Sequence, residues 1–308
     1  MQQTRPSSRI RPGLSRIREL DPRLYQITVL GLLLIYGIGW LDFEVTFQQA
    51  LITLGSCLLV QYLLTHIFRL PAFDARSALI SGLSLCLLLR TNELWLAAAA
   101  ATVTIASKFI VRFRGKHVFN PTNFGLVAMI WLTGRVWVSS GQWGSGALFA
   151  FLMACLGGLV VNRAARSDVS LAFLSFYAAL LFARSGWLGE PLSIPWHRLQ
   201  NGALLLFTFF MISDPKTTPN SRAGRIVFAF MVALGTGYVH FVLFRPNGLI
   251  LSLAALSAAV PLIDRLLPGP RYQWRDTAQV AKQLNQGECY ETTLETLARH
   301  SVEPRAVV

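Results

Sequence analysis

The chain has 308 residues, of which 53% are hydrophobic and only 14% are charged, and its mean hydropathy is +0.48. This apolar composition excludes an ordinary soluble domain and is typical of a polytopic membrane protein. The net charge of +13 does not indicate nucleic-acid binding, because the basic residues lie between apolar segments and form no patch interleaved with aromatic residues.

Residues 1–23 are rich in arginine, and we expect a basic cytoplasmic N-terminal segment there. A transmembrane domain follows over residues 24–267. A helix needs about 20 residues to cross a bilayer, and most of the apolar segments in this domain reach that length or approach it. They lie near 24–41, 47–68, 77–89, 94–112, 121–138, 146–162, 168–184, 199–212, 224–243 and 248–266.

The charges in the loops predict the topology. If the N-terminus is cytoplasmic, most of the 28 lysines and arginines fall on the inner side of ten crossings. The outer side then holds only Arg90, Arg135, Arg184, Arg198 and Arg245. Because inner loops of membrane proteins carry an excess of lysine and arginine, we expect a multi-pass protein with both termini in the cytoplasm.

Two apolar segments, the third and the eighth, are too short to cross a bilayer, and each is third within a half of five. An asparagine-proline or proline-asparagine pair, 120–121 and 246–247, starts the fifth segment of each half. Since five is odd, the two halves run in opposite directions. The fold class that we predict is therefore an all-α polytopic membrane protein with about ten transmembrane helices. These form two inverted five-helix repeats, 24–138 and 146–266, with broken third helices, a pattern that points to a binding site near the midplane.

Residues 268–270 read Pro-Gly-Pro and end the last helix. We expect residues 268–308 to form a cytoplasmic tail with one amphipathic helix, either solvated or docked on a partner. The chain has four cysteines, and none has the spacing of a zinc or iron–sulfur site. We therefore predict no metal site.

A polar stretch opens the fifth segment, and it includes Asn120, Pro121 and Asn123. Pro121 suits the first turn of a helix, and Asn120 can cap the helix through its side-chain oxygen. Both residues are therefore explained either as a cap or as part of a site. Asn123 lies inside the first turn, where it is free to contact a ligand. Lys108, near the inner end of the fourth segment, either snorkels to the surface or faces the same cavity.

A second polar cluster follows the short eighth segment, and its candidate site residues are Asp214, Thr217 and Thr218. This cluster is either a polar cytoplasmic turn or a re-entrant loop, because irregular backbone at membrane depth must line a cavity or pack inside protein. The predicted topology places it on the same side as Asn120. These residues include no catalytic acid or nucleophile by spacing, and we predict no catalytic residue.

The apolar segments themselves are nearly free of ionisable residues. A self-contained ion pump carries such residues within its spans, so the pattern favours a site for a neutral or aromatic molecule. An inverted repeat with broken helices would equally serve a channel or permease for a small solute.

With these motifs the chain resembles the NqrB/RnfD membrane family, whose members are subunits of the Na⁺-translocating NADH:quinone oxidoreductase and of the Rnf electron transport complex. The resemblance is closest to compact stand-alone homologues of the enediyne-biosynthesis type. It is carried by SALISGL at 77–83, Lys108, FNP at 119–121 with Gly125, SDP at 213–215 with Thr217 and Thr218, and Gly224-Arg225.

The resemblance implies a bacterial inner-membrane protein that binds a flavin and relays electrons, as a redox-complex subunit more than as a self-contained enzyme. Riboflavin or FMN would be held noncovalently by Asn120, Pro121, Asn123, Lys108, Asp214, Thr217 and Thr218. A redox partner subunit or a soluble flavoprotein would exchange electrons with it. The alternatives are a channel or permease, or a biosynthesis-associated membrane protein with a degenerate site.

Many members of this family also carry an FMN joined to the threonine of a Ser-Gly-Ala-Thr motif, in the outer loop after the fifth helix. The corresponding loop here, 139–146, reads SSGQWGSG and has no threonine, and the motif is absent from the whole sequence. We therefore expect no covalent FMN.

Overall fold

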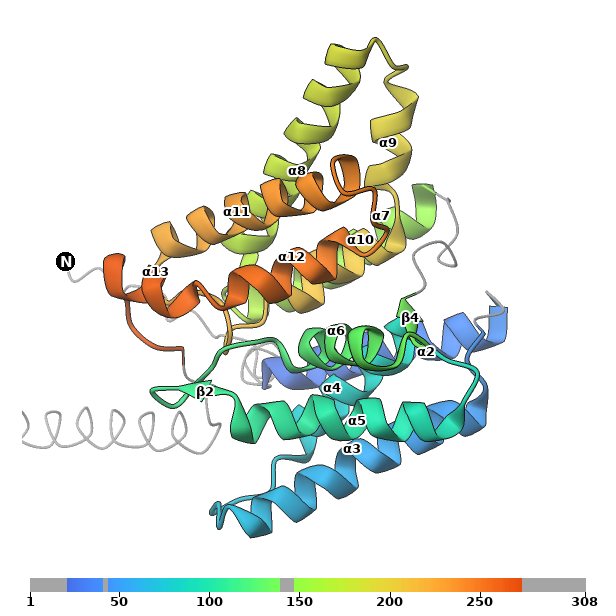
Figure 1. The fold of residues 1–308 in the computed structure, drawn as a ribbon, viewed down its shortest axis with the longest axis vertical. Helices are drawn as coiled ribbons and strands as arrows, with labels where there is room; N and C mark the ends of the chain where they lie inside the picture. The colour runs from blue at the N-terminus through green and yellow to red at the C-terminus, as the bar shows by residue number, and fades with distance from the viewer. Residues whose placement is uncertain (1–20, 41–43, 139–146, 273–308) are drawn as a thin grey trace, which may run out of the picture. The chain divides into compact units, whose positions relative to one another are not determined.

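Helices follow one another through nearly all of the region that the computed structural model describes, residues 21–40, 44–138 and 147–272 (Figure 1). Residues 22–272 form one compact unit. The predicted N-terminal segment up to residue 20, the loop 139–146 and the predicted tail helix after residue 272 lie outside the described residues.

The first predicted half contains five helices, and three of them begin with a side-chain cap, as local rules predict. Thr46 accepts a hydrogen bond from the Gln49 N–H (3.1 Å), and Asp74 accepts one from the Ser77 N–H (3.1 Å), as short polar N-cap side chains do. The helices are α2 (Pro22–Trp40), α3 (Phe47–Ile67), α4 (Ala75–Leu88), α5 (Leu94–Ile110) and α6 (Pro121–Thr133).

The second half has the same number of apolar segments but more breaks. Its elements are α7 (Ala147–Arg163), α8 (Ser167–Leu188), α9 (Ser193–Leu199), α10 (Gly202–Leu206), the π-helical segment η1 (Phe207–Met211), α11 (Arg222–Phe241), α12 (Gly248–Ser257) and α13 (Val260–Leu266). The short helix α9 lies where we predicted a loop, and the change from α to π geometry divides the short eighth segment.

Each of the ten predicted apolar segments contains helix, so the mostly helical membrane fold is confirmed. Four helices in the described part, α2, α3, α8 and α11, are long and apolar enough to cross a bilayer. The pair α12 and α13, which is bent by 53°, would add a fifth span if counted as one. The predicted number of ten crossings stays a prediction.

The fifth segment shows why some predicted spans are shorter than expected. We predicted an apolar segment over 121–138, but α6 ends at Gly134, which has a left-handed φ of 61° and donates its N–H to the Ile130 carbonyl (3.1 Å). Glycine ends helices in this way because it has no Cβ to clash in the left-handed region. Beyond it, β4 (Trp137–Val138) pairs antiparallel with β1 (Leu89–Arg90). The all-α prediction therefore missed these short strands.

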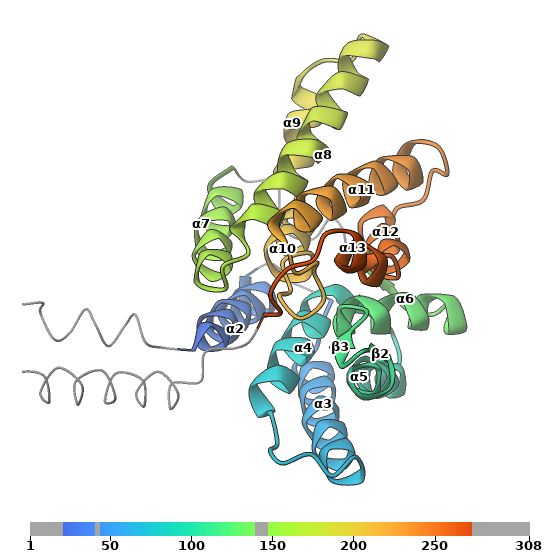
Figure 2. The same ribbon diagram turned by 90° about the vertical axis from the view of Figure 1, so that its left-hand side faces the viewer.

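The packing of the helices follows the same order in both halves. The second and fourth helices pack together in each half, as α3 with α5 and α8 with α11; the fourth also packs on the fifth, as α5 with α6 and α11 with α12. The first packs on the third, as α2 with α4 and α7 with α10. Between the halves, α6 packs on α12 and α2 packs on α7 (Figure 2).

A tight hairpin joins α5 to α6. Its strands are β2 (Arg112–Phe113) and β3 (Lys116–His117), and Arg114 and Gly115 form the turn with φ values of 50° and 79°. Two successive positive φ values are those of a type I′ turn, which glycine and asparagine usually occupy. Arg114 therefore stands at a strained position.

His117 in β3 is mostly buried beside several cations. Burial, and then the charges of Arg112, Lys108 and Lys216, lower the pKa of His117 from 6.5 to about 3. The imidazole is therefore neutral in the folded protein at physiological pH.

A glycine sets the distance between α5 and α6. A Cβ at Gly125 would overlap the hydroxyl of Thr104 and lie 3.2 Å from the Thr104 Cα. Both residues are inside the protein, and the backbone of α5 cannot move away without disturbing its own packing. The close approach of these helices therefore requires glycine at position 125.

We predict that Gly125→Ala lowers the free energy of unfolding by about 1–3 kcal/mol, the usual cost of overpacking a core. Thermal unfolding in detergent would measure the loss. Adding Thr104→Ala should restore part of it, because that change removes the overlapping hydroxyl. Gly55→Ala in α3, where a new Cβ meets nothing within 4 Å, is the matched control and should not destabilise. Equal stability of the two single variants would contradict the prediction.

A second prediction concerns pH. Because the folded pKa of His117 lies below its unfolded value, the stability from its neutral form is complete above pH 6.5 and is lost as pH falls toward 3. Between pH 7.5 and 5 the wild type should lose about 2 kcal/mol of unfolding free energy on this account. The variant His117→Gln should lack that part of the pH dependence, and His66→Gln, at an exposed site in α3, should retain it. Identical pH profiles for wild type and His117→Gln would refute this.

Candidate functional site

Asn120 caps α6 and also reaches the second half of the chain. Its side-chain oxygen accepts from the Asn123 N–H (3.1 Å), as predicted for an N-cap residue. Its side-chain nitrogen donates to the Met211 carbonyl (3.4 Å) and to the Asp214 carboxylate (3.3 Å). The start of α6 is thereby joined to the turn that follows η1, and two of the predicted site residues, Asn120 and Asp214, are in direct contact.

Asn123 is completely buried and only partly satisfied. Its side-chain nitrogen donates to the Ile250 carbonyl in α12 (3.1 Å). Its oxygen, Oδ1, has no hydrogen-bond partner among the described residues. A buried polar atom left without a partner costs about 1–3 kcal/mol, so this atom marks a place where a donor from a bound molecule would be favourable.

The second predicted cluster is a compact turn that begins at Asp214. The Asp214 carbonyl accepts from the N–H groups of Thr217 (3.2 Å) and Thr218 (3.1 Å) and from both of their hydroxyls (3.3 and 3.0 Å). The Asp214 carboxylate accepts from the Lys216 N–H (3.0 Å). Burial raises the pKa of Asp214, and these hydrogen bonds and nearby lysines oppose that rise.

The remaining predicted site residues have structural partners. Pro121 is buried as the first residue of α6. Lys108 is buried and donates to the carbonyl (2.8 Å) and the hydroxyl (3.0 Å) of Ser77 in α4. The hydrogen bonds of Lys108 therefore stay within the first half and do not include Asn120 or Asp214.

Lys116 completes the connection between the halves, although our set of predicted site residues did not include it. Its ammonium donates to the Thr218 carbonyl (2.6 Å), to the Asn220 side-chain oxygen (3.2 Å) and to the Asp264 carboxylate (2.7 Å). Burial lowers the pKa of Lys116, and Asp264 opposes that shift. Its place in the polar stretch before Asn120 was the only signal in the sequence, because its partners lie more than 100 residues away.

A second ion pair fixes α11 nearby. The guanidinium of Arg225 binds the carboxylate of Asp168 at the start of α8 through two nitrogens (2.8 and 2.5 Å) and donates to the Asn220 carbonyl (2.7 Å). The Gly224-Arg225 pair belonged to the motif that carried the family resemblance, but its ion-pair partner was not predicted.

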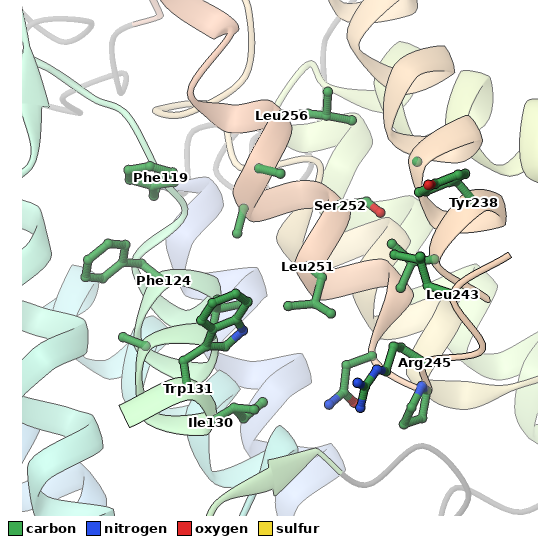
Figure 3. Close-up of a pocket in the computed structure, with 18 of the residues that line it drawn as sticks. Phe119, Phe124, Ile130, Trp131, Tyr238, Leu243, Arg245, Leu251, Ser252 and Leu256 are labelled. Atoms are coloured by element: carbon green, nitrogen blue, oxygen red, sulfur yellow. The ribbon is translucent and has the colours of Figure 1, made fainter. Parts of the chain in front are cut away.

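An apolar groove of about 1260 Å³ lies between α6, α11 and α12 (Figure 3). Figure 3 shows Phe119, Phe124 and Trp131 on one side, Leu251 and Ser252 in the middle, and Tyr238 on the other side. Phe119 and Phe124 flank Asn120 and Asn123 in the sequence, so one stretch of chain supplies both aromatic walls and the buried amides. The groove suits a large apolar or aromatic molecule.

Polar atoms are few in this groove. The hydroxyl of Ser252 is buried and has no partner among the described residues, and Arg245 and Asn247 also belong to the lining. Within the described part of the chain no three histidine, cysteine or carboxylate side chains are grouped to hold a metal ion. The groove itself therefore offers an aromatic surface with few polar groups, and the amides and the carboxylate of the polar cluster come from Asn120, Asn123 and Asp214, which are not in its lining.

Comparison with known proteins finds a family match in the second half of the chain. A model of the NQR2, RnfD, RnfE family matches residues 131–272. The D subunit of an ion-translocating oxidoreductase complex from Erwinia tasmaniensis is 32% identical over 148 residues, which are 47% of this chain and 37% of that protein. The protein of the same name from Escherichia coli O1:K1 is 30% identical over 140 residues, 45% of this chain and 33% of that protein.

The matches to these curated relatives thus cover about a third of the relatives' length. The family match includes Asp214, Thr217, Thr218 and Arg225, and it begins after the polar stretch that contains Asn120. The motifs of the sequence and these matches agree, and the chain resembles the NQR2, RnfD, RnfE family.

Proposed function

We propose that this chain is a membrane-embedded electron-transfer subunit that holds a flavin, riboflavin or FMN, noncovalently beside Asn120, Asn123 and Asp214. The relatives that it matches are named subunits of an ion-translocating oxidoreductase complex, and several of its helices are long and apolar enough to cross a membrane. Bound flavin would supply the redox chemistry, since it accepts electrons from a donor and passes them on.

The observation that carries this proposal is the buried Oδ1 of Asn123, which has no partner among the described residues. An oxidised flavin carries an N–H in its ring and hydroxyls on its ribityl chain, and either would satisfy this acceptor. Asn120 and Asp214 lie within the same hydrogen-bonded group. The residues therefore fit a flavin in their donors and acceptors.

The groove beside this cluster supports the proposal by providing room. Its volume of about 1260 Å³ exceeds that of typical small-molecule sites, and Phe119, Phe124 and Trp131 offer surfaces on which a planar ring can stack. The polar cluster would then orient the ring by its edge, while the groove would exclude water from its faces.

The finer features of the protein belong to the same proposal. Ten crossings in two inverted repeats, in a bacterial inner membrane with both termini in the cytoplasm, would place the cluster on the cytoplasmic side. Electrons would then pass between the flavin and a partner subunit or a soluble flavoprotein. Because the sequence lacks the Ser-Gly-Ala-Thr motif, the proposal includes no covalent FMN.

We predict that the full chain, purified in detergent from a flavin-replete host, shows visible flavin absorbance that acid precipitation releases to the supernatant. Asn123→Ala should reduce the bound flavin about tenfold or more, because it removes a contact in a buried site. The control Asn162→Ala changes an exposed asparagine of α7 and should leave flavin content unchanged. Size-exclusion profiles and melting temperatures would show that each variant is folded.

A third variant locates the ring. Trp131→Ala should also weaken flavin binding if the ring occupies the groove, and it should have no effect if the flavin lies only against the polar cluster. Colourless wild-type protein would refute the flavin proposal and leave a channel, a permease or a degenerate site. Stoichiometric flavin in Asn123→Ala would place the flavin elsewhere, and flavin that stays with the precipitate would contradict noncovalent binding.

A further inference from the structure

A second cavity, of about 190 Å³, lies beside the hairpin between α5 and α6. Helix α13 and the segment that follows it form the opposite wall. Its charged lining consists of Arg114, Lys116, Asp264, Arg265 and Arg271. None of the residues proposed to contact the flavin lines this cavity, so it is separate from the flavin site.

The one carboxylate that the described residues contribute to this lining is already neutralised. Asp264 accepts from the ammonium of Lys116 (2.7 Å) and from the Asn220 N–H (2.7 Å), and both ionic side chains are mostly buried, with 15% and 16% exposure. The ammonium of Lys116 also donates hydrogen bonds to the Thr218 carbonyl and to the Asn220 side chain. This pair therefore forms a neutral, rigid wall of the cavity.

The other three cations have no such compensation. Among the described residues, no carboxylate lies within ion-pair distance of Arg114, Arg265 or Arg271. Arg271 donates to the Arg114 carbonyl (2.9 Å), which fixes one guanidinium against the turn that carries another. Holding like charges around one cavity is unfavourable, and a bound anion would relieve that repulsion.

One further observation agrees with a ligand at this turn. Arg114 keeps a strained left-handed conformation, with φ 50°, at a turn position that asparagine or glycine would occupy more easily.

We propose that this cavity binds a phosphate group. Guanidinium groups match the geometry of phosphate oxygens and form two parallel hydrogen bonds with them, and the walls leave space for a compact anion and not for a large ring. The same chemistry occurs in the headgroup of an anionic phospholipid and in a soluble phosphate compound. The cavity lies between the hairpin and α13.

The test uses the full chain purified in detergent and phosphate-free buffer. One arm adds inorganic phosphate against chloride at equal ionic strength and records the melting temperature. The other arm adds phosphatidylglycerol against phosphatidylcholine and counts bound lipids by native mass spectrometry. We expect specific stabilisation or binding in at least one arm, and the responding arm identifies the source of the phosphate.

The variant Arg265→Gln with Arg271→Gln should weaken that response about tenfold or more, because it removes two charge-assisted contacts. The matched control is Arg69→Gln with Arg222→Gln, which removes the same charge from exposed arginines outside the cavity, and it should respond as the wild type does. Equal weakening in both double variants would mean a diffuse basic surface and would overturn the proposal. No response of the wild type in either arm would overturn it as well.

Discussion

Backbone carbonyls at a helix break need donors, and in a bilayer water is not there to supply them. In this protein the second half breaks at η1, in the turn after Asp214 and at the start of α12. Three side chains from one short stretch of the first half, Lys116, Asn120 and Asn123, donate to carbonyls at or near these breaks. These hydrogen bonds, together with the packing of α6 on α12 and of α2 on α7, connect the two halves. They also hold the polar cluster in place.

This arrangement explains why so many polar groups are tolerated at the mouth of an apolar helix. The side-chain oxygen of Asn120 accepts a hydrogen bond from its own helix, and its side-chain nitrogen donates to the turn at Asp214. The ammonium of Lys116 donates hydrogen bonds to three acceptors, on Thr218, Asn220 and Asp264. The side-chain oxygen of Asn123 remains, and it differs from its neighbours in having no described structural partner. A cap alone would not require that atom, because α6 already has its cap.

The helices could be predicted from the sequence because they follow local rules. The side-chain contacts between the halves could not, because their partners are far apart in the chain. The cap at Asn120, the first-turn position of Pro121 and the location of each apolar segment follow from short-range rules. The left-handed end of α6 follows from a local signal, Gly134, that our prediction did not use. The sequence carries no comparable signal for the π geometry of η1. These two features shortened or divided the predicted spans. The pairing of Asn123 with Ile250 or of Lys116 with Asp264 joins residues 127 and 148 positions apart, and a single sequence has no signal for such a pairing.

The cationic residues divide by their partners into two kinds with different roles. Arg225 and Lys116 lie in mostly buried ion pairs with Asp168 and Asp264, where losing one partner would leave an uncompensated charge and cost several kcal/mol. Arg265 and Arg271 are exposed and lie beside a carboxylate that Lys116 already neutralises. The positive-inside rule explains the presence of cations at such a helix end, but it does not require them to surround a cavity. Among the described residues of that lining, Asp264 is the only carboxylate, and its ion pair with Lys116 leaves none to compensate the arginines. The excess positive charge is therefore concentrated at this cavity.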